Sequence, residues 1–263
     1  MESHADLSGR MGEPAVRTPV TLHRFHVPGA ATGRMELPEA ARLHATRVIR
    51  LDLGDALRVF DQGAEFDATI AAIEKHRVLI EVGAPAAAMP ERAVPLHLVM
   101  SALKGDLTEL VIQKATELGV ARISPVVFDR TDTVARQDPS PARVERWHRV
   151  AAGAAEQSGR AWVPGIDPVV TLERAMESLG PPGEGELRVV ATEPAIDPGQ
   201  TRREPPRSVR SVAVAVGPAG GLSVRDLETL DTAGFARERF ALHTLRSETA
   251  CLAALAILGD RYR

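Results

Sequence analysis

Residues 212–223, VAVAVGPAGGLS, carry the clearest signal for the fold of this chain. Its five apolar residues predict a buried strand, and the glycines that follow predict a tight loop. Ser223, with Asp226 three residues further on, has the spacing of a capping box at the start of a helix. A buried strand that leads through a glycine-rich loop into a helix is the repeating unit of a parallel α/β domain.

The glycine-rich loop at 217–222 is also a candidate ligand site. Glycines let the backbone approach a ligand closely, and the N–H groups at the start of a helix attract polar or anionic atoms. The loop has neither the GxGxxG pattern of a dinucleotide site nor the GK[ST] ending of a P-loop. A tight turn that needs a positive φ explains the glycines equally well, so both interpretations stay open at this point.

Strands and helices alternate on both sides of this stretch. The helix predicted over 107–118 carries an apolar stripe, follows a cap predicted at Asp106 and ends before Gly119. The other predicted strands are at 96–100, 123–128, 187–191 and 235–242, and the other helices at 140–158, 172–179, 223–232 and 248–258. This alternation predicts a mainly parallel sheet with helices on both faces, over residues 95–263.

The N-terminal part of the chain has the pattern of short strands separated by turn residues. Strands predicted at 22–27, 56–60, 65–73 and 77–82 indicate a small β-barrel over residues 19–88. The exception is a short helix predicted over 37–50, with Pro38 in its first turn. The aperiodic segments are predicted as a flexible leader at 1–18, a Pro/Ala/Gly linker at 83–94 and a Pro/Arg-rich loop at 197–210.

The composition excludes several classes of protein. Cys251 is the only cysteine, which excludes a disulfide framework and a thiolate-rich zinc site. The eight histidines lack the spacing of metal ligands, so no metal is expected. No apolar run approaches the roughly 20 residues of a membrane span, and no secretory signal is present, so we predict a cytoplasmic protein. Aromatic residues make up 3%, which disfavours base-stacking RNA-binding platforms.

The basic residues are almost all arginine. Only Lys75, Lys104 and Lys114 are lysine, which leaves 29 of the 32 basic residues as arginine. Codon preference in a GC-rich genome explains most of this bias. However, seven arginines lie within 122–160 and four within 202–210, and such clusters can form a local phosphate-binding face on a chain of net charge −3. A solvated surface is the alternative.

The second candidate site is LRSETA, residues 245–250, which lies between a predicted strand and a predicted helix. Capping of the helix explains Ser247. It does not explain Arg246, because a cation is unfavourable near the positive end of a helix. Arg246 is therefore a candidate functional residue.

Several strings taken together resemble one family. They are LKGD at 103–106, VIQKATELGV at 111–120, AEQSGR at 155–160, GPAGGL at 217–222 and LRSETA at 245–250. Their order and spacing resemble the RsmE family, which are uridine-N3 methyltransferases of small-subunit (16S) ribosomal RNA in the SPOUT class. The dipeptide at 24–25 and HATRVIR at 44–50 resemble its N-terminal PUA-like barrel.

The resemblance implies S-adenosylmethionine as methyl donor, a C-terminal SPOUT domain tied in a trefoil knot, and a homodimer. It implies a cofactor pocket made by Thr192, Glu193, Gly217, Pro218, Gly220, Gly221, Leu242, Leu245, Arg246, Ser247 and Thr249. It also implies contacts with 16S ribosomal RNA by Arg24, Arg47, Arg50, Lys104, Arg130 and Arg160. Ribosomal RNA, in the small ribosomal subunit, is the expected partner.

The sequence departs from the family pattern near the implied pocket. Ala219 stands where the family usually has Glu, and ALH at 241–243 stands where it usually has Gly-Pro-Arg. Both departures put affinity and activity in question. They motivate an alternative, a non-catalytic RNA-binding or ribosome-assembly protein with the same fold. A SPOUT enzyme that acts on transfer RNA is a third interpretation.

Methyl transfer to N3 of uracil requires loss of the N3 proton, which is present at neutral pH. We expect Arg246 to stabilise the negative charge that develops on the uracil carbonyls. Glu248 is the weaker candidate, as a base or as the residue that holds Arg246.

Overall fold

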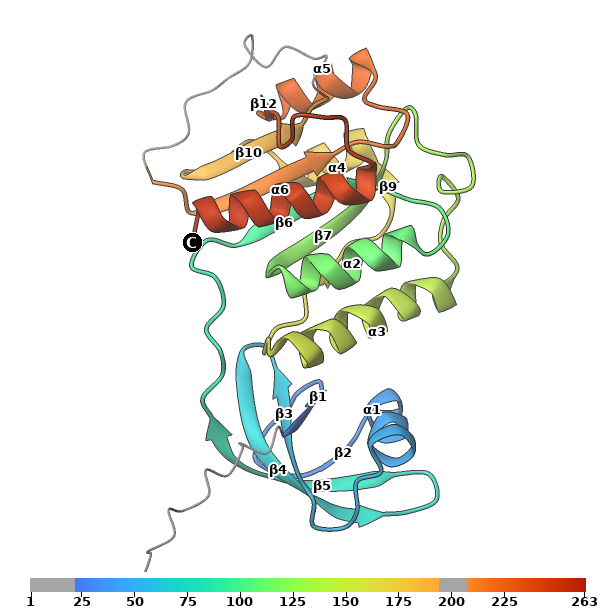
Figure 1. Ribbon diagram of the computed structural model, residues 1–263, viewed down its shortest axis with the longest axis vertical. Helices are drawn as coiled ribbons and strands as arrows, with labels where there is room; N and C mark the ends of the chain where they lie inside the picture. The colour runs from blue at the N-terminus through green and yellow to red at the C-terminus, as the bar shows by residue number, and fades with distance from the viewer. Residues whose placement is uncertain (1–21, 194–207) are drawn as a thin grey trace, which may run out of the picture.

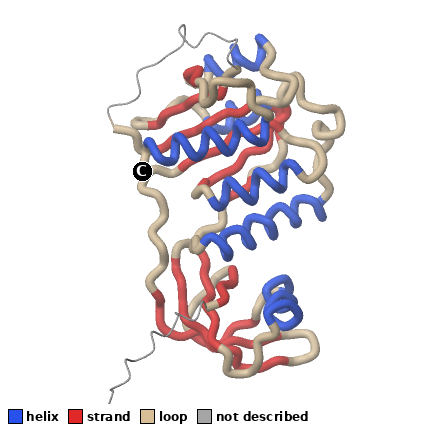
Figure 2. The backbone as a smooth tube through the Cα atoms, in the orientation of Figure 1, coloured by secondary structure: helices blue, strands red, loops and turns tan. Residues whose placement is uncertain are grey.

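The computed structural model describes residues 22–193 and 208–263, which form two domains stacked along the long axis of the molecule (Figure 1). The N-terminal domain is a five-stranded sheet with one helix beside it, and the C-terminal domain is a larger sheet covered by helices (Figure 2). The predicted α/β fold class is therefore confirmed. The predicted leader, 1–18, and residues 197–207 of the predicted Pro/Arg-rich loop lie outside the described residues.

The N-terminal sheet has the strand order β1-β3-β4-β5-β2. Its strands are β1 (His23–His26), β2 (Gly33–Glu36), β3 (Ala56–Asp61), β4 (Ala64–Ile73) and β5 (Val78–Ala86). β1 pairs with β3 in parallel, and the other pairs are antiparallel. The inward residues of the strands form one core with Ala41 of α1 (Glu39–Leu43) and Ala45 of its π-helical continuation η1 (His44–Ile49).

Two parts of this domain differ from the prediction. The sequence does not predict β2, because GRME alternates between half-buried and exposed positions and offers one large apolar side chain, Met35. β5 continues into the predicted 83–94 linker, because Pro85 and Ala86 still pair with Phe66 and Glu65 of β4. The linker is therefore shorter than its composition indicates.

The C-terminal sheet has the strand order β12-β10-β11-β6-β7-β8, and β9 pairs with β7. Its strands are β6 (Leu96–Ser101), β7 (Val120–Val127), β8 (Gly165–Ile166), β9 (Val170–Thr171), β10 (Glu186–Ala191), β11 (Ser211–Val216) and β12 (Ala236–Glu238). Within the described residues, every pairing in this sheet is parallel. The carboxyl ends of β10 and β11 lie side by side, where ligands commonly bind in open parallel sheets.

Helices cover both faces of the C-terminal sheet. They are α2 (Leu107–Glu117), α3 (Pro141–Ser158), α4 (Leu172–Leu179), α5 (Val224–Thr232) and α6 (Ser247–Arg261). One core joins alternate residues of β6 and β11 to α2, α3 and α6, and a second core joins the intervening residues to α4 and α5. Burial on both faces explains why 212–216 is apolar at every position.

The ends of α2, α5 and β12 can be compared with the boundaries predicted from the sequence. Ser223 and Asp226 form the predicted capping box of α5. Asp106 does not cap α2 with its side chain, so that prediction is wrong. The Thr108 hydroxyl, in the first turn of α2, accepts from the N–H of Leu103 at 3.2 Å and donates to its carbonyl at 2.9 Å. β12 ends at Glu238, four residues before the predicted end of that strand. The trefoil knot implied by the resemblance stays a prediction.

Buried arginines hold the ends of several helices. Arg188, whose side chain is 1% exposed, donates to the carbonyls of Leu179 and Gly180 at the end of α4 and to that of Ala233 just after α5. These carbonyls lack partners within their own helices. A planar guanidinium reaches several of them at once, which the single ammonium of lysine does not. Part of the arginine excess therefore has a structural use.

Candidate functional site

A pocket of about 260 Å³ lies where the carboxyl ends of β10 and β11 meet the start of α6. Three segments that are distant in the sequence form its wall: residues 191–193, the glycine-rich loop and the 240–247 segment. The lining residues are Ala191, Thr192, Glu193, Val216, Gly217, Pro218, Ala219, Gly221, Leu222, Phe240, Ala241, His243, Thr244, Leu245, Arg246, Ser247 and Ala250. The lining combines apolar side chains with hydroxyls, a carboxylate, an imidazole and a guanidinium.

The glycine-rich loop is packed so closely that a side chain at either of two positions would displace a neighbouring side chain. A Cβ on Gly217 would lie 2.6 Å from Cδ2 of Leu222. A Cβ on Gly221, where φ is +74°, would lie 2.8 Å from Oε1 of Glu193. These glycines bring the backbone of the loop against the pocket wall, and at Gly221 the positive φ is also required. The positive φ at Gly221 confirms the interpretation of a tight turn, whereas the interpretation as a ligand site stays a prediction.

The start of α6 is bound to the glycine-rich loop. Ser247 is the first residue of the helix, and its hydroxyl donates to the carbonyl of Gly217 at 2.7 Å. The N-cap is Arg246, so the prediction that Ser247 caps the helix is wrong. Among the described residues, none forms a hydrogen bond or an ion pair with the exposed Arg246 guanidinium, which lines the pocket and can contact a ligand.

Most of the residues predicted to bind the cofactor lie together in this pocket. Gly220, Leu242 and Thr249 do not line it. The Leu242 side chain is 74% exposed, because the chain leaves the sheet before this residue. Glu248, predicted as a base or as a partner of Arg246, is also absent from the lining.

Sequence reasoning missed Ala191, Val216, Phe240 and Ala250, which line the pocket. One signal for Ala250 was available. It follows Arg246 by four residues and therefore lies on the same face of a helix. Phe240 gave no such signal, because an apolar side chain is equally expected in the strand predicted at 235–242.

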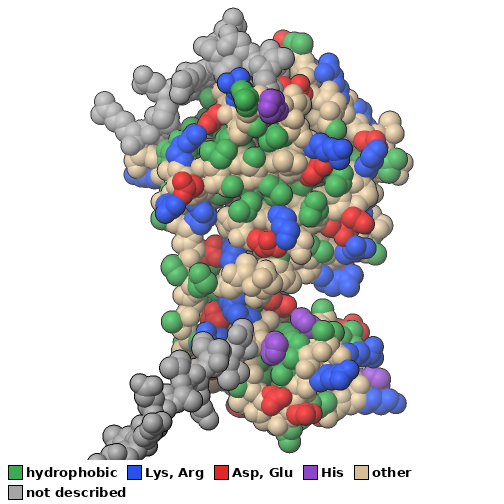
Figure 3. Space-filling view, viewed as in Figure 1, with side chains coloured by type: hydrophobic (Ala, Val, Ile, Leu, Met, Phe, Trp, Pro, Cys, Tyr) green, Lys and Arg blue, Asp and Glu red, His purple; other side chains and the backbone are tan. Residues whose placement is uncertain are grey.

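Four of the six residues predicted to contact RNA are exposed. Arg47 and Arg50 lie on and just after η1, and Lys104 lies after β6. Arg130 lies beside the pocket, where its Nη1 donates to the carbonyl of Gly220 at 3.2 Å. On the face shown in Figure 3, Lys and Arg side chains are interspersed with Asp and Glu.

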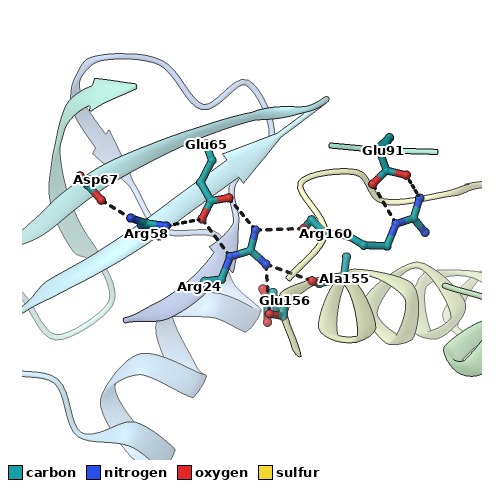
Figure 4. A network of polar contacts seen from close by, with 8 residues as sticks. All are labelled: Arg24, Arg58, Glu65, Asp67, Glu91, Ala155, Glu156 and Arg160. Carbon is teal, nitrogen blue, oxygen red and sulfur yellow. Dashed lines mark hydrogen bonds and ion pairs between the residues drawn. The ribbon is translucent and has the colours of Figure 1, made fainter. Parts of the chain in front are cut away.

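The other two, Arg24 and Arg160, are largely enclosed between protein groups (Figure 4). Arg24 pairs with Glu65, and Arg160, whose side chain is 10% exposed, pairs with Glu91. Both guanidiniums also donate to main-chain carbonyls. Both arginines therefore have a structural role, because their donors are used inside the protein, and we do not include them in the RNA contacts proposed below.

Residues 22–193 and 208–263 contain no group of three or more His, Cys, Asp or Glu side chains placed to hold a metal ion. Across the same ranges, no helix is both long and apolar enough to span a membrane. Burial raises the pKa of the Cys251 thiol, and the charge of Glu248 adds to this effect. The neutral thiol is a poor nucleophile, consistent with a packing role.

Comparison with family models identifies both domains. Residues 90–259 match the RNA methyltransferase domain, and residues 37–83 match the RNA methyltransferase PUA domain. The chain belongs to this RNA methyltransferase family. The PUA-like character of the N-terminal domain, predicted from the resemblance, is thereby confirmed.

Relatives of this methyltransferase include two proteins named ribosomal RNA small subunit methyltransferase E. The one from Synechocystis is 29% identical over 82% of this chain and 70% of its own length. The one from Bacillus subtilis is 28% identical over 82% of this chain and 86% of its own length. The resemblance to the RsmE family is therefore confirmed.

Solved structures of similar proteins support the same fold. The methyltransferase Lpg2936 from Legionella pneumophila, in complex with SAM, has a TM-score of 0.80 and 28% identity over 92% of this chain and 98% of its own. Ribosomal RNA small subunit methyltransferase E from Neisseria gonorrhoeae, bound to S-adenosyl methionine, has a TM-score of 0.78 and 26% identity over the same shares.

Proposed function

We propose that this chain is an S-adenosylmethionine-dependent methyltransferase that methylates N3 of a uridine in small-subunit (16S) ribosomal RNA. The observation that carries the proposal is the pocket at the ends of β10 and β11, in a domain that matches the RNA methyltransferase family. The names of the relatives support the RNA substrate, and the SAM-bound neighbours support the cofactor.

The residues of the pocket fit such a cofactor. Val216, Leu222, Phe240 and Leu245 supply apolar surface suited to an adenine ring, and the glycine-rich loop brings backbone groups to the cavity. The Glu193 carboxylate suits ribose hydroxyls or the positive sulfur. S-adenosylmethionine supplies an electrophilic methyl group on a positively charged sulfur. It carries no phosphate, which agrees with the absence of a P-loop motif.

Arg246 is the residue that we propose acts on the uracil. Loss of the N3 proton places negative charge on the adjacent carbonyl oxygens, and a guanidinium beside them stabilises that charge. The position of Arg246 in the lining supports this role, whereas Glu248 lies outside the lining and is dropped from the proposal. Glu193 and His243 are lining side chains that can accept a proton.

We further propose that Arg47, Arg50, Lys104 and Arg130 contact RNA phosphates, because all four side chains are exposed. The first two lie on the N-terminal PUA domain and the other two on the methyltransferase domain. A homodimer, with the cofactor near the subunit interface, and a cytoplasmic site of action at the small ribosomal subunit complete the proposal.

Transfer of labelled methyl groups to small-subunit RNA tests this proposal. At saturating cofactor, Arg246→Ala is expected to lower kcat by about 10²–10³-fold, the typical cost of losing one group that stabilises developing charge. Arg174→Ala, an exposed arginine on α4, is the matched control and is expected to retain full activity. Unchanged methylation by Arg246→Ala would contradict the role of Arg246.

Calorimetric titration with S-adenosylmethionine separates the enzyme from the non-catalytic alternative. The proposal predicts measurable binding by the wild-type protein. Absence of binding would favour an RNA-binding or assembly protein that has kept the fold.

A further inference from the structure

The N-terminal PUA domain, called the barrel below after its predicted form, and the methyltransferase domain are joined by a partly buried polar network that the proposed function does not yet use (Figure 4). We call the network formed by Arg24, Glu65, Glu156 and Arg160 the domain clamp. Arg24 and Glu65 come from β1 and β4 of the barrel, whereas Glu156 and Arg160 come from the end of α3 and the residues after it. The clamp therefore connects residues about 130 positions apart in the sequence.

The centre of the clamp is the guanidinium of Arg24. Its Nε and Nη2 donate to the two carboxylate oxygens of Glu65, at 3.0 and 2.9 Å. Its remaining hydrogen bonds cross to the other domain, where it donates to the carbonyls of Ala155, Glu156 and Arg160 at 3.2–3.3 Å. The carbonyl end of a helix carries partial negative charge, so one largely enclosed cation interacts with both the carboxylate and the end of α3.

Backbone contacts fix the same interface. The N–H of His26 donates to Oε1 of Glu156 at 2.9 Å, and the N–H of Gly63 donates to the carbonyl of Ala161 at 3.0 Å. Gly63 lies against the indole of Trp162, and a Cβ at Gly63 would be 2.6 Å from its Nε1. Main-chain groups of both domains form these hydrogen bonds, and main-chain groups move less than side chains. The contacts therefore fix the position of one domain relative to the other.

The clamp is connected to the pocket through rigid elements. The guanidinium of Arg160 donates to the carbonyls of Thr116, at the end of α2, and Val120, at the start of β7, at 2.9 and 3.0 Å. β7 then runs for eight residues, about 26 Å, towards Arg130, which contacts the glycine-rich loop. A shift at the clamp therefore changes the placement of the whole barrel relative to the pocket.

We propose that the domain clamp determines which uridine is methylated, because it sets the distance and direction between RNA held by the barrel and the pocket. Arg24 and Glu156 are thus positioning residues. This inference rests on the proposed function, and in particular on RNA contacts by Arg47 and Arg50 of the barrel. Small errors in the placement of a substrate lower rates steeply, so a loosened clamp affects both rate and choice of site.

The test compares Arg24→Lys with Arg58→Lys. Lysine at position 24 keeps the charge and loses the fork that spans Glu65 and the three carbonyls. Arg58 also pairs with Glu65, but its other partner is Asp67 of the barrel, so Arg58→Lys is the matched control. Glu156→Ala, which removes the acceptor of the His26 N–H, is the second test variant if Arg24→Lys does not fold.

Three readouts are needed for each variant: the positions of methylated uridines in small-subunit RNA by mass spectrometry, kcat/KM, and cofactor affinity by calorimetry. We expect the clamp variant to methylate additional uridines and to lose at least tenfold in kcat/KM, with cofactor affinity unchanged within twofold. Small-angle scattering should show a more extended molecule. The control should match the wild type in these three readouts and in the scattering.

A folded clamp variant with the wild-type methylation site and kcat/KM within twofold of the wild type would overturn this inference and leave the proposed function intact. If the wild-type protein methylates no uridine in this RNA, the proposed function fails and the inference fails with it.

Discussion

Replacement of Arg160 by lysine distinguishes a structural arginine from an RNA-binding one. The Arg160 guanidinium makes four hydrogen bonds, two to Glu91 at 3.0 and 2.6 Å and two to the carbonyls of Thr116 and Val120. Lysine keeps the charge, and therefore any general attraction to phosphate, but its single nitrogen does not span these acceptors.

The expected cost follows from the contacts that are lost. If lysine keeps one or two of the four bonds, two or three acceptors are left partly unsatisfied at about 1 kcal/mol each, so the free energy of unfolding should fall by about 2–3 kcal/mol. For a chain of this size that is a fall in Tm of about 4–12 °C. Arg160→Met, which leaves the Glu91 carboxylate without its partner, should cost about 3–5 kcal/mol.

Thermal and urea unfolding measure these changes, and Arg149→Lys, an exposed arginine on α3, is the control with an expected change within about 0.5 kcal/mol. RNA affinity measured against salt concentration should have the same slope for wild type and Arg160→Met, because the side chain releases no counterions from RNA. Two results together would refute a structural role for Arg160. They are a loss in the free energy of unfolding below about 0.5 kcal/mol for Arg160→Lys, and a slope of log RNA affinity against log salt concentration reduced by about one for Arg160→Met.

Two further predictions concern a buried histidine and the glycine-rich loop. Burial, with a smaller contribution from Arg122, lowers the pKa of His97 to about 4. The unfolded chain therefore binds the proton more readily than the folded protein, so the stabilisation by the neutral His97 is fully present above pH 6.5 and is lost as pH falls through about 4. In urea unfolding between pH 7 and pH 4, the wild type should lose up to about 3 kcal/mol more than His97→Gln, and equal losses would count against the assignment. Gly221→Ala should raise the Kd for S-adenosylmethionine at least tenfold by displacing Glu193, whereas Gly29→Ala, at the same φ but with open space around it, should change it less than twofold. Equal effects of the two substitutions would count against displacement of Glu193 as the cause.

The sequence predicts the architecture of the C-terminal domain well because its signals are local. The apolar run at 212–216, the glycines that follow and the Ser223 cap each depend on a few neighbouring residues, and all three are present as expected. The residues of 217–222 and 245–247 were predicted as one pocket from the family resemblance. Their meeting in space depends on the parallel pairing of distant strands.

The features that sequence reasoning missed depend on distant parts of the chain. Arg24 and Arg160 look like any surface arginine in sequence, because the helix ends that enclose them lie about 40 to 130 residues away. The predicted strand at 235–242 contains apolar residues to its end, yet the chain turns away after Glu238 and its continuation forms a wall of the pocket. A pocket lined by apolar side chains has the same sequence signal as a buried strand.

Nucleoside mass spectrometry of small-subunit ribosomal RNA from a strain that lacks this gene tests the proposed function most directly. One 3-methyluridine should disappear in the deletion strain, return with the wild-type gene, and not return with Arg246→Ala. An unchanged level of 3-methyluridine in the deletion strain would show that this chain is not the uridine-N3 methyltransferase that we propose.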